Sequence, residues 1–148
     1  MTTIRKMLTG VQSIKLAEQL PIIIQDTSPE IVRLNRFQLY NQSVDKQGDP
    51  LRLYGSLSYA LEKNKMNPAP GFGRPDLFLT GSFQRAIYVE VSGQVIKVWS
   101  RDSKADSLTK KYGEIFGMTK ESKSEYAKKT VLPAIKAHIK AKSGLVFR

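Results

Sequence analysis

The sequence predicts an α+β fold in which a small antiparallel β-sheet with a central hairpin is packed by N-terminal and C-terminal helices. Three patterns indicate this fold: apolar residues at helical spacing near the N-terminus, alternation of apolar and polar residues in the middle, and a second helical pattern near the C-terminus. At 148 residues the chain has the length of one domain, so we take 1–148 as a single structural domain.

Two helices are predicted at the N-terminal end. The first covers 3–25 and contains Pro21, which ends or kinks it. The second begins within "TSPEIVRLNRFQLY", where Ser28 suits the N-cap and Pro29 suits the first helical position. The apolar stripe of the first helix consists of Ile4, Met7, Leu8, Val11 and Ile14.

A short helix and a long irregular stretch follow a polar loop, "NQSVDKQGDP". Ser56 is the expected N-cap of the short helix, and Leu57, Ala60 and Leu61 are expected to face the core. The stretch "MNPAPGFGRPD" holds three prolines and two glycines. It is therefore predicted to be irregular, and it is a candidate partner-binding loop.

The central segment "IYVEVSGQVIKVWS" alternates with a period of two residues and predicts a hairpin. A tight turn at Ser92-Gly93 would pair Val89 with Ile96 and keep the apolar side chains on one face. The opposite face, which we expect to be partly covered because it carries a tryptophan, consists of Tyr88, Glu90, Lys97 and Trp99.

Two further elements are expected beside the hairpin. Thr80 can cap one or two helical turns over 81–86, immediately before the first strand. A single hairpin is only marginally stable in water, so a further strand is expected within 37–53.

The C-terminal part predicts two helices. Residues 105–112 are helical in pattern, with Gly113 as the stop. A last helix is predicted over 123–142, started by a capping box of Ser122 and Glu125. Pro133 lies inside this pattern, where it either kinks the helix or starts a new one.

The charge is strongly basic, with a formal net charge of +11 and 13 Lys or Arg against 5 Asp or Glu from Lys97 onward. Such a surface can contact nucleic acid, meet an acidic partner or simply be solvated. Aromatic residues are not interleaved with these charges, which disfavours single-strand binding by stacking and leaves loose contact with phosphates. The candidate DNA-facing residues on the outer face of the last helix are Lys128, Lys129, Lys136, Lys140 and Lys142.

The composition offers few groups for catalysis. There is no cysteine and one histidine, His138, so thiolate metal sites, disulfides and thiol nucleophiles are excluded. No glycine-rich phosphate loop is present. The N-terminus is broken by charges and lacks the apolar core of a signal peptide, so we expect synthesis in the cytoplasm and no membrane partner. We predict no enzyme activity, no cofactor and no metal.

One short pattern supports an alternative. Asp76 after Pro75, followed later by Asp102 and Lys104, has the outline of a Mg²⁺-dependent PD-(D/E)xK nuclease, and a basic surface suits DNA. Such sites need their carboxylates on adjacent strands. Both aspartates are instead expected in loops, so a nuclease or DNA-binding accessory protein remains the alternative prediction.

The order of elements resembles the neck and tail-completion proteins of tailed bacteriophages, of the virion-morphogenesis type and close to variants from phages of Bacteroidetes. In this family an L-x-x-TG-x-(L/F) turn leads into a β-hairpin, and a proline-started helix closes the domain. The corresponding stretches here are 77–83, 88–100, 112–117 and 132–142. The residues before the proline of the last helix differ from the family pattern. This chain has "KKTVLP" where Arg-x-Phe-Leu is frequent in the family.

The resemblance implies a structural virion protein that forms a homo-oligomeric ring in the neck, between portal and tail, around the DNA channel. Its implied partners are other neck, portal and tail proteins and the packaged DNA, which it would contact without reading sequence. It would be located in the virion, and in the host cytoplasm during assembly. The interface candidates lie in the Pro/Gly loop, at the hairpin tip and in the C-terminal segment: Phe72, Arg74, Ser92, Gly93, Leu145, Val146 and Phe147.

Overall fold

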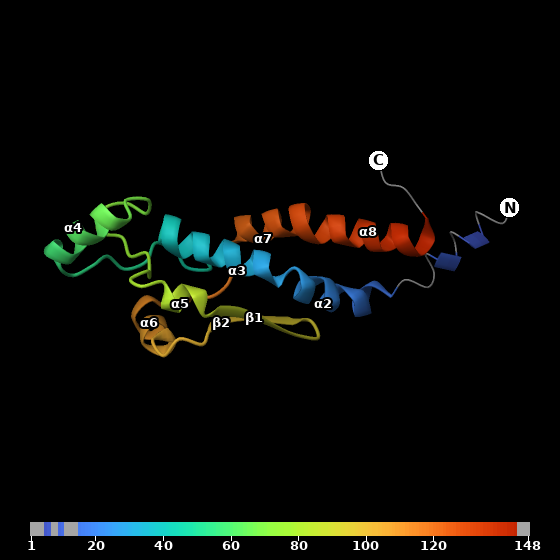
Figure 1. Ribbon diagram of the computed structural model, residues 1–148, viewed down its shortest axis with the longest axis horizontal. Coiled ribbons are helices and arrows are strands. Elements are labelled where there is room, and N and C mark those ends of the chain that lie inside the picture. The colour runs from blue at the N-terminus through green and yellow to red at the C-terminus, as the bar shows by residue number, and fades with distance from the viewer. Residues whose placement is uncertain (1–4, 7–8, 11–14, 145–148) are drawn as a thin grey trace.

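The computed structural model describes residues 5–6, 9–10 and 15–144 and shows an elongated molecule (Figure 1). A C-terminal helical run lies along an N-terminal one, the hairpin lies against the N-terminal run, and α4 is at one end. The bounds are α2 Leu16–Asp26, α3 Ser28–Phe37, the π-helical turn Gln38–Gln42, α4 Leu57–Met66, α5 Ser82–Arg85, β1 Ile87–Ser92, β2 Val95–Ser100, α6 Ala105–Tyr112, α7 Lys120–Tyr126, the π-helical turn Ala127–Val131 and α8 Leu132–Ser143. This confirms the predicted α+β class.

The hairpin turn lies one residue later than predicted. Ser92 pairs with Val95, so Gly93 and Gln94 form the two-residue turn. Gly93 has a φ of 58°. The first residue of such a turn needs a positive φ, which glycine adopts freely. This explains why the turn begins at Gly93 and not at Ser92.

The shifted turn changes the pairing but preserves the two faces. Val89 lies opposite Val98 rather than Ile96, a register shift of two residues that keeps apolar side chains on one side. Glu90 lies opposite Lys97 on the other face. The Lys97 ammonium lies 5.6 Å from the centre of the Trp99 ring, and the tryptophan is partly buried, as predicted.

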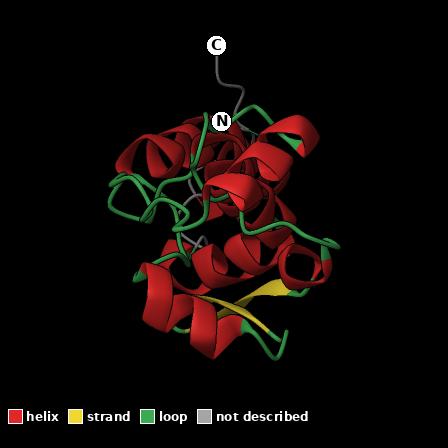
Figure 2. Ribbon diagram, turned by 90° about the vertical axis from the view of Figure 1, so that its left-hand side faces the viewer, coloured by secondary structure: helices red, strands yellow, loops and turns green. Residues whose placement is uncertain are grey.

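The sheet has two strands, and the further strand expected within 37–53 is absent from the described residues. That segment forms the π-helical turn that extends α3 and then one isolated bridge between Val44 and Pro50. Helices α2 and α3 pack on β1 instead. Figure 2, which looks along the long axis from the α4 end, shows the strands confined to one side of the helices. Helix packing therefore supplies the support that a lone hairpin lacks.

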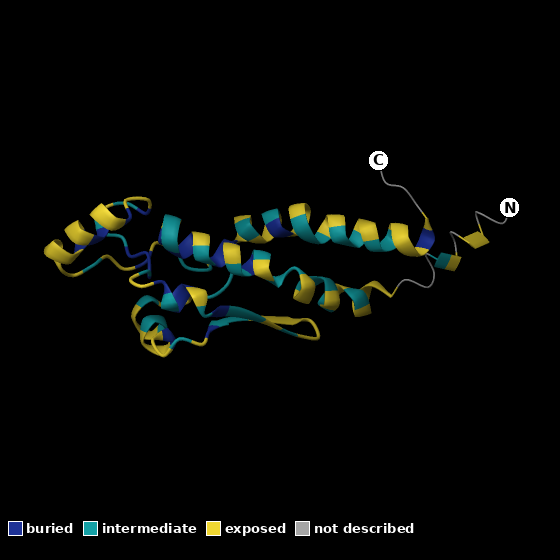
Figure 3. Cartoon of the chain, in the orientation of Figure 1, coloured by how far each residue is buried: buried dark blue, intermediate teal, exposed yellow. Residues whose placement is uncertain are grey.

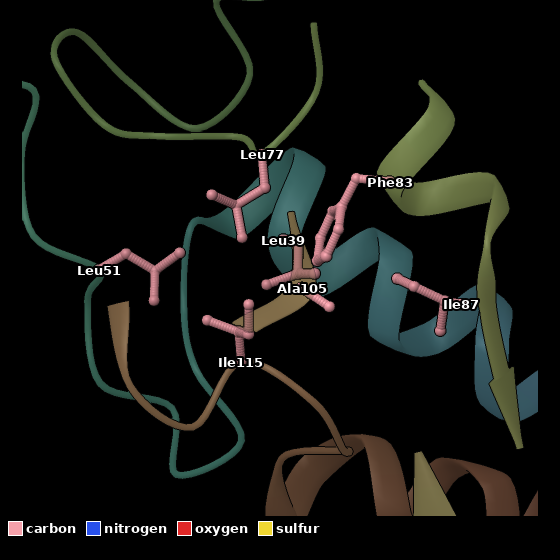
Figure 4. Packing of buried hydrophobic residues seen from close by; sticks show 7 residues of the cluster. All are labelled: Leu39, Leu51, Leu77, Phe83, Ile87, Ala105 and Ile115. Atoms are coloured by element: carbon pink, nitrogen blue, oxygen red, sulfur yellow. The ribbon is translucent and has the colours of Figure 1, made fainter. Parts of the chain in front are cut away.

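The core consists of two clusters of buried apolar side chains. One joins α3 to α7 through Ile31, Leu34, Met118 and Tyr126. The other gathers residues from seven places along the chain (Figure 4): Leu39, Leu51, Leu77, Phe83, Ile87, Ala105 and Ile115. The larger cluster fixes the loops as well as the helices, because several of its members lie outside any helix or strand.

Two buried polar residues of the N-terminal helical run hold the segment before α7. The Asn35 amide donates to the carbonyls of Ile115 and Gly117 at 3.0 and 2.9 Å. Gln38 donates to the Gly117 carbonyl at 3.0 Å and accepts from the Thr119 N–H at 2.9 Å. These amides satisfy backbone groups that burial would otherwise leave unpaired.

The terminal helices differ from their predicted bounds. Lys15 has φ −98° and ψ 83°, outside the helical region, so the predicted helix over 3–25 is not one unbroken helix. All five residues of its predicted stripe lie outside the described residues. Pro21 lies inside α2 and does not end it.

The C-terminal helical run starts earlier than the predicted 123–142. Thr119, rather than Ser122, is the N-cap, and its hydroxyl accepts from the Ser122 N–H at 3.2 Å. The run passes through Pro133 by way of the π-helical turn Ala127–Val131. Since proline has no N–H and its ring crowds the preceding turn, a widened turn directly before it lets the helix continue.

Helix α4 contradicts the predicted inward face. Ser56 is its N-cap, as predicted, and accepts from the Tyr59 N–H at 3.4 Å. Ala60 is buried, but Leu57 and Leu61 are 68% and 48% exposed. Figure 3 shows most of the α4 ribbon in the colour of exposed residues. The helix pattern in the sequence was correct, but no described segment lies over these two leucines.

Candidate functional site

A half-open cleft of about 430 Å³ lies between α4, the segment before α5, and α6. Its walls are largely aromatic and aliphatic, with lysines among them. The lining side chains that matter here are Tyr54, Tyr59, Lys63, Asp76, Leu77, Phe78, Lys104, Leu108, Lys111 and Tyr112. Apolar walls with a few charged groups among them are the usual character of a binding site.

A buried ion pair forms the floor of the cleft. Lys63 of α4 and Asp76 have side chains only 6% and 2% exposed, and their charged atoms are 2.8 Å apart. The Lys63 ammonium also donates to the Phe78 carbonyl. The Asn67 amide donates to the second carboxylate oxygen of Asp76 at 3.1 Å. Both charges are thus compensated, as burial requires.

The segment that carries Asp76 is fixed by its own hydrogen bonds. The Asp76 carboxylate accepts from the Phe78 N–H at 3.0 Å, and the Gln84 amide donates to the Asp76 carbonyl at 2.8 Å. Between them Leu77 has a φ of 51°, a conformation that costs a non-glycine residue roughly 1–3 kcal/mol. Its side chain is buried in the larger core cluster. Burial and the aspartate turn together hold this strained backbone.

The L-x-x-TG-x-F turn forms one wall of the cleft. Gly81 has a φ of 83°, and a Cβ there would lie 2.9 Å from the Phe78 ring. This position therefore requires glycine. Thr80 lies outside the helical turn that it was predicted to cap; Gly81 is the N-cap of α5. The Thr80 hydroxyl still accepts from the Ser82 N–H at 3.4 Å.

Tyr54 lies beside the ion pair. Its hydroxyl accepts from the Asp76 N–H at 3.4 Å, and its ring meets that of Tyr59 edge to face at 4.9 Å. Burial raises the pKa of the Tyr54 hydroxyl above its ordinary value, and the negative charge of Asp76 raises it further. Tyr54 is therefore a neutral hydroxyl across the physiological range.

The cleft brings together residues that sequence reasoning treated separately. Tyr54 and Tyr59 come from the α4 region, whereas Lys104, Lys111 and Tyr112 come from the α6 region. In the sequence the aromatic residues are not interleaved with the basic ones, so only the fold places them side by side. No local signal in the sequence would have identified this site.

The fold brings together only part of the predicted nuclease pattern of Asp76, Asp102 and Lys104. Asp76 and Lys104 line the same cleft, whereas Asp102 is not among the residues that line it. Hydrogen bonding to the Lys104 N–H lowers the pKa of Asp102. Neither aspartate lies on a strand, and Asp76 is committed to Lys63. In the part of the chain that the structure describes, no three His, Asp or Glu side chains are placed to hold a metal ion.

The predicted surface residues have mixed outcomes. The candidate DNA-facing lysines are exposed, and Lys129 pairs with Glu125 at 3.4 Å. Among the interface candidates, Phe72, Ser92 and Gly93 are exposed. Arg74 is half-buried and donates to the Ser43 carbonyl at 3.4 Å. The remaining candidates, Leu145, Val146 and Phe147, lie outside the described residues.

Exposed apolar surface gathers toward both ends of the molecule. At the α4 end the exposed side chains are Leu53, Leu57, Leu61, Met66, Phe72 and Leu79. Toward the other end, α2 and α8 enclose a groove of about 200 Å³, the α2–α8 groove, lined by Leu16, Ala17, Leu20, Ile23 and Ile135. Isolated apolar residues are common on protein surfaces, but gathered ones mark contacts with partners.

Comparison with known proteins gave no match to a family model, a curated protein or a solved structure. Among the described residues, no helix is both long and apolar enough to cross a membrane.

Proposed function

We propose that this protein is a structural component of a tailed-phage virion that forms a ring in the neck, between portal and tail, around the DNA channel. The observation that carries the proposal is the placement of uncovered apolar surface toward both ends of the molecule, which is elongated (Figure 1). Two different apolar surfaces on one chain suit a head-to-tail contact, which repeats from copy to copy and forms a ring when the rotation between copies closes.

The structure of the L-x-x-TG-x-F turn, which carries the resemblance to the phage family, supports the same proposal. The stretch 77–83, which carries the L-x-x-TG-x-F pattern, forms the strained wall of the cleft and leads through α5 into β1. Its glycine is required by a close approach of the Phe78 ring. The pattern therefore has a structural reason in this chain, as expected of a motif that builds a scaffold.

The exposed lysines suit contact with packaged DNA. Lys136, Lys140 and Lys142 lie on α8, which contains no acidic residue. Lysine ammonium groups contact phosphates without reading base sequence. A ring that presents α8 toward its channel would thus attract DNA and still let it pass.

Quantitative mass spectrometry of purified particles tests the ring proposal. We expect a fixed low copy number per particle, equal to that of the portal or a simple fraction of it. Particles that contain the portal but lack this protein would exclude the virion role.

A salt titration tests the DNA contact. Binding to duplex DNA should weaken with salt, and the triple change Lys136→Gln, Lys140→Gln and Lys142→Gln should reduce the slope of log K against log salt by about 2–3. The matched control removes the same charge elsewhere through Lys65→Gln, Lys97→Gln and Lys110→Gln. An equal loss of slope in both triple variants would show that net charge, and not α8, sets the contact.

A Mg²⁺-dependent nuclease remains the second candidate, because the fold places Asp76 and Lys104 in one cleft. DNA cleavage by the purified protein that Asp102→Ala abolishes would favour it. Asp106→Ala, which changes an exposed aspartate of α6 that does not line the cleft, is the control. Cleavage that survives Asp102→Ala, or no cleavage at all, would remove this candidate.

A further inference from the structure

We propose that copies of this chain join head to tail by seating the α4 ridge of one copy, formed by Leu57 and Leu61, in the α2–α8 groove of the next. This inference rests on the proposed ring function and names the contact that would build the ring. The occupant of the groove is a second copy of the chain.

The α4 ridge has the pattern of a buried helix face but is not buried. Leu57 and Leu61 are four residues apart and therefore lie one above the other on the helix. The fold turns Ala60 and Lys63 inward, which leaves both leucines on an open flank. In water such a ridge costs the free energy of exposed apolar surface, part of which a contact would recover.

The α2–α8 groove has the complementary shape. It is a concave strip with an aliphatic lining from two helices, and Leu16 and Leu20 at its edge are themselves exposed. Side chains spaced four residues apart on one helix form a ridge, and such ridges pack into grooves on other helices. A pair of α4 ridges from two copies would bring together only four leucines, whereas the groove already presents five residues around a hollow.

Charges beside the α4 ridge and beside the α2–α8 groove also favour this contact. Glu62 follows Leu61 on the exposed side of α4, and Lys136 follows Ile135 on α8. Both are exposed and opposite in sign. Lys65, also exposed, continues the ridge one turn beyond Leu61 and has to stay outside the groove. At the other edge of the groove Lys15 and Glu18 form an ion pair at 3.6 Å and leave no net charge. Opposite charges at the rim favour correct encounter without having to be buried, and a Lys136 engaged with Glu62 leaves Lys140 and Lys142 to face DNA.

A single copy cannot make this contact with itself. Figure 1 shows α4 at one end of the molecule, beyond the start of α7, and the groove helices toward the other end. The helical run Lys120–Ser143 alone is about 36 Å long at 1.5 Å per residue. The ridge and the groove therefore meet only between copies, and the contact is heterologous, so each copy keeps a free ridge and a free groove for its neighbours.

Disulfide trapping tests the contact, and the chain suits it because it contains no cysteine. Leu61→Cys and Leu20→Cys variants, one carrying a mass tag, are mixed and oxidised. We expect the mixed dimer to exceed each homodimer by about tenfold or more, because a disulfide requires Cα atoms within about 7 Å. Replacing Leu61→Cys by Met66→Cys measures random collision, because Met66 is exposed and lies about 140° around α4 from Leu61 at 3.6 residues per turn.

Two other results of the disulfide trapping would contradict the proposed contact. A dominant Leu61→Cys homodimer would indicate a two-fold contact between α4 ridges. A mixed dimer no more abundant than with Met66→Cys would mean that something else fills the groove, such as residues 145–147 of the same chain or another virion protein.

Interface-breaking variants give an independent readout. Leu61→Asp blocks the ridge and keeps the groove, whereas Leu20→Asp blocks the groove and keeps the ridge. Each variant alone should stay monomeric in sedimentation at concentrations where the parent chain associates, and their mixture should form a one-to-one dimer. Association of either variant alone like the parent chain, or no dimer in the mixture at concentrations where the parent associates, would contradict the contact.

The experiments distinguish failure of the virion-ring proposal from failure of the proposed contact between copies. A protein found in particles at fixed copy number but not trapped through Leu20 and Leu61 keeps its virion role and loses this contact. A trapped head-to-tail dimer from a protein absent from particles keeps the contact and loses the virion role.

Discussion

Helices α3 and α4 have the same length, ten residues each, but are held in opposite ways. Helix α3 lies between β1 and α7 and buries Ile31, Leu34 and Asn35. Helix α4 lies at the end of the molecule and buries only Ala60 and Lys63. Its attachment therefore depends on one small side chain, one ion pair and the contact of Tyr59 with Tyr54, whereas that of α3 depends on a continuous apolar face.

The difference shows which part of the chain is scaffold and which part is available to partners. Apolar burial on two sides makes α3 part of the cooperative core. Helix α4 keeps its apolar ridge on the outside, and the polar contact at its base orients that ridge. Four predictions test this division, in order of decreasing effect.

The largest effect is expected from Asp76→Ala, which removes the anchor of α4. Lys63 would be left buried without its partner, and losing one partner of a buried pair costs about 3–5 kcal/mol. Urea unfolding should show this loss, and hydrogen exchange should show lost protection in α4 while α3 stays protected.

The double variant Lys63→Met with Asp76→Ala is the control for charge. It should be more stable than Asp76→Ala alone, because no uncompensated charge remains buried. A double variant less stable than Asp76→Ala would mean that the lysine supports α4 by packing and not through the pair.

The second effect is expected from Ile31→Ala in α3. This side chain is fully buried, and truncation of a buried isoleucine costs about 2–5 kcal/mol through lost transfer and the cavity left behind. The measurement is the free energy of unfolding in urea. A loss below about 1 kcal/mol would show that α3 is not part of the stabilising core.

The third effect depends on pH and concerns Tyr54. Burial and Asp76 raise the pKa of its hydroxyl in the folded state above the ordinary value of 10. The folded chain therefore holds this proton more tightly than the unfolded chain, so the contribution is complete below pH 10 and is lost as pH rises further.

Stability measured from pH 9 to pH 12 should fall less steeply in Tyr54→Phe than in the parent chain. At neutral pH the loss of its hydrogen bond should cost only about 0.5–1.5 kcal/mol. Equal slopes in the two proteins would show that Tyr54 titrates normally. Tyr88→Phe, which changes a tyrosine of the hairpin, is the control.

The smallest effect is expected from Leu57→Ser in α4. Because this side chain is two-thirds exposed, the monomer should change by no more than about 0.5 kcal/mol. A loss comparable to that of Ile31→Ala would show that the ridge is covered within the monomer and would contradict its role as a free surface. The measurement is again urea unfolding, at a concentration where the chain is monomeric.

Local chemistry was predictable from the sequence, and so were the elements that depend on it. The helix over 105–112 and its end at Gly113 were confirmed, because turn glycines and polar caps act within a few residues. The hairpin was also predicted with its faces assigned correctly, since the alternation of side chains is independent of the register. The turn itself was misplaced by one residue, because two adjacent positions had similar turn chemistry.

The tertiary structure alone decided what those elements meet. The pattern of Leu57 and Leu61 predicted an inward face, but a pattern specifies only that two side chains share a side, not which side is covered. Lys63 and Asp76 are an ordinary surface lysine and loop aspartate in the sequence, and the fold turns them into a buried pair. The same applies to the cleft, whose tyrosines and lysines are brought together by contacts between segments distant in the chain. Such contacts depend on how whole elements pack, which no stretch of neighbouring residues encodes.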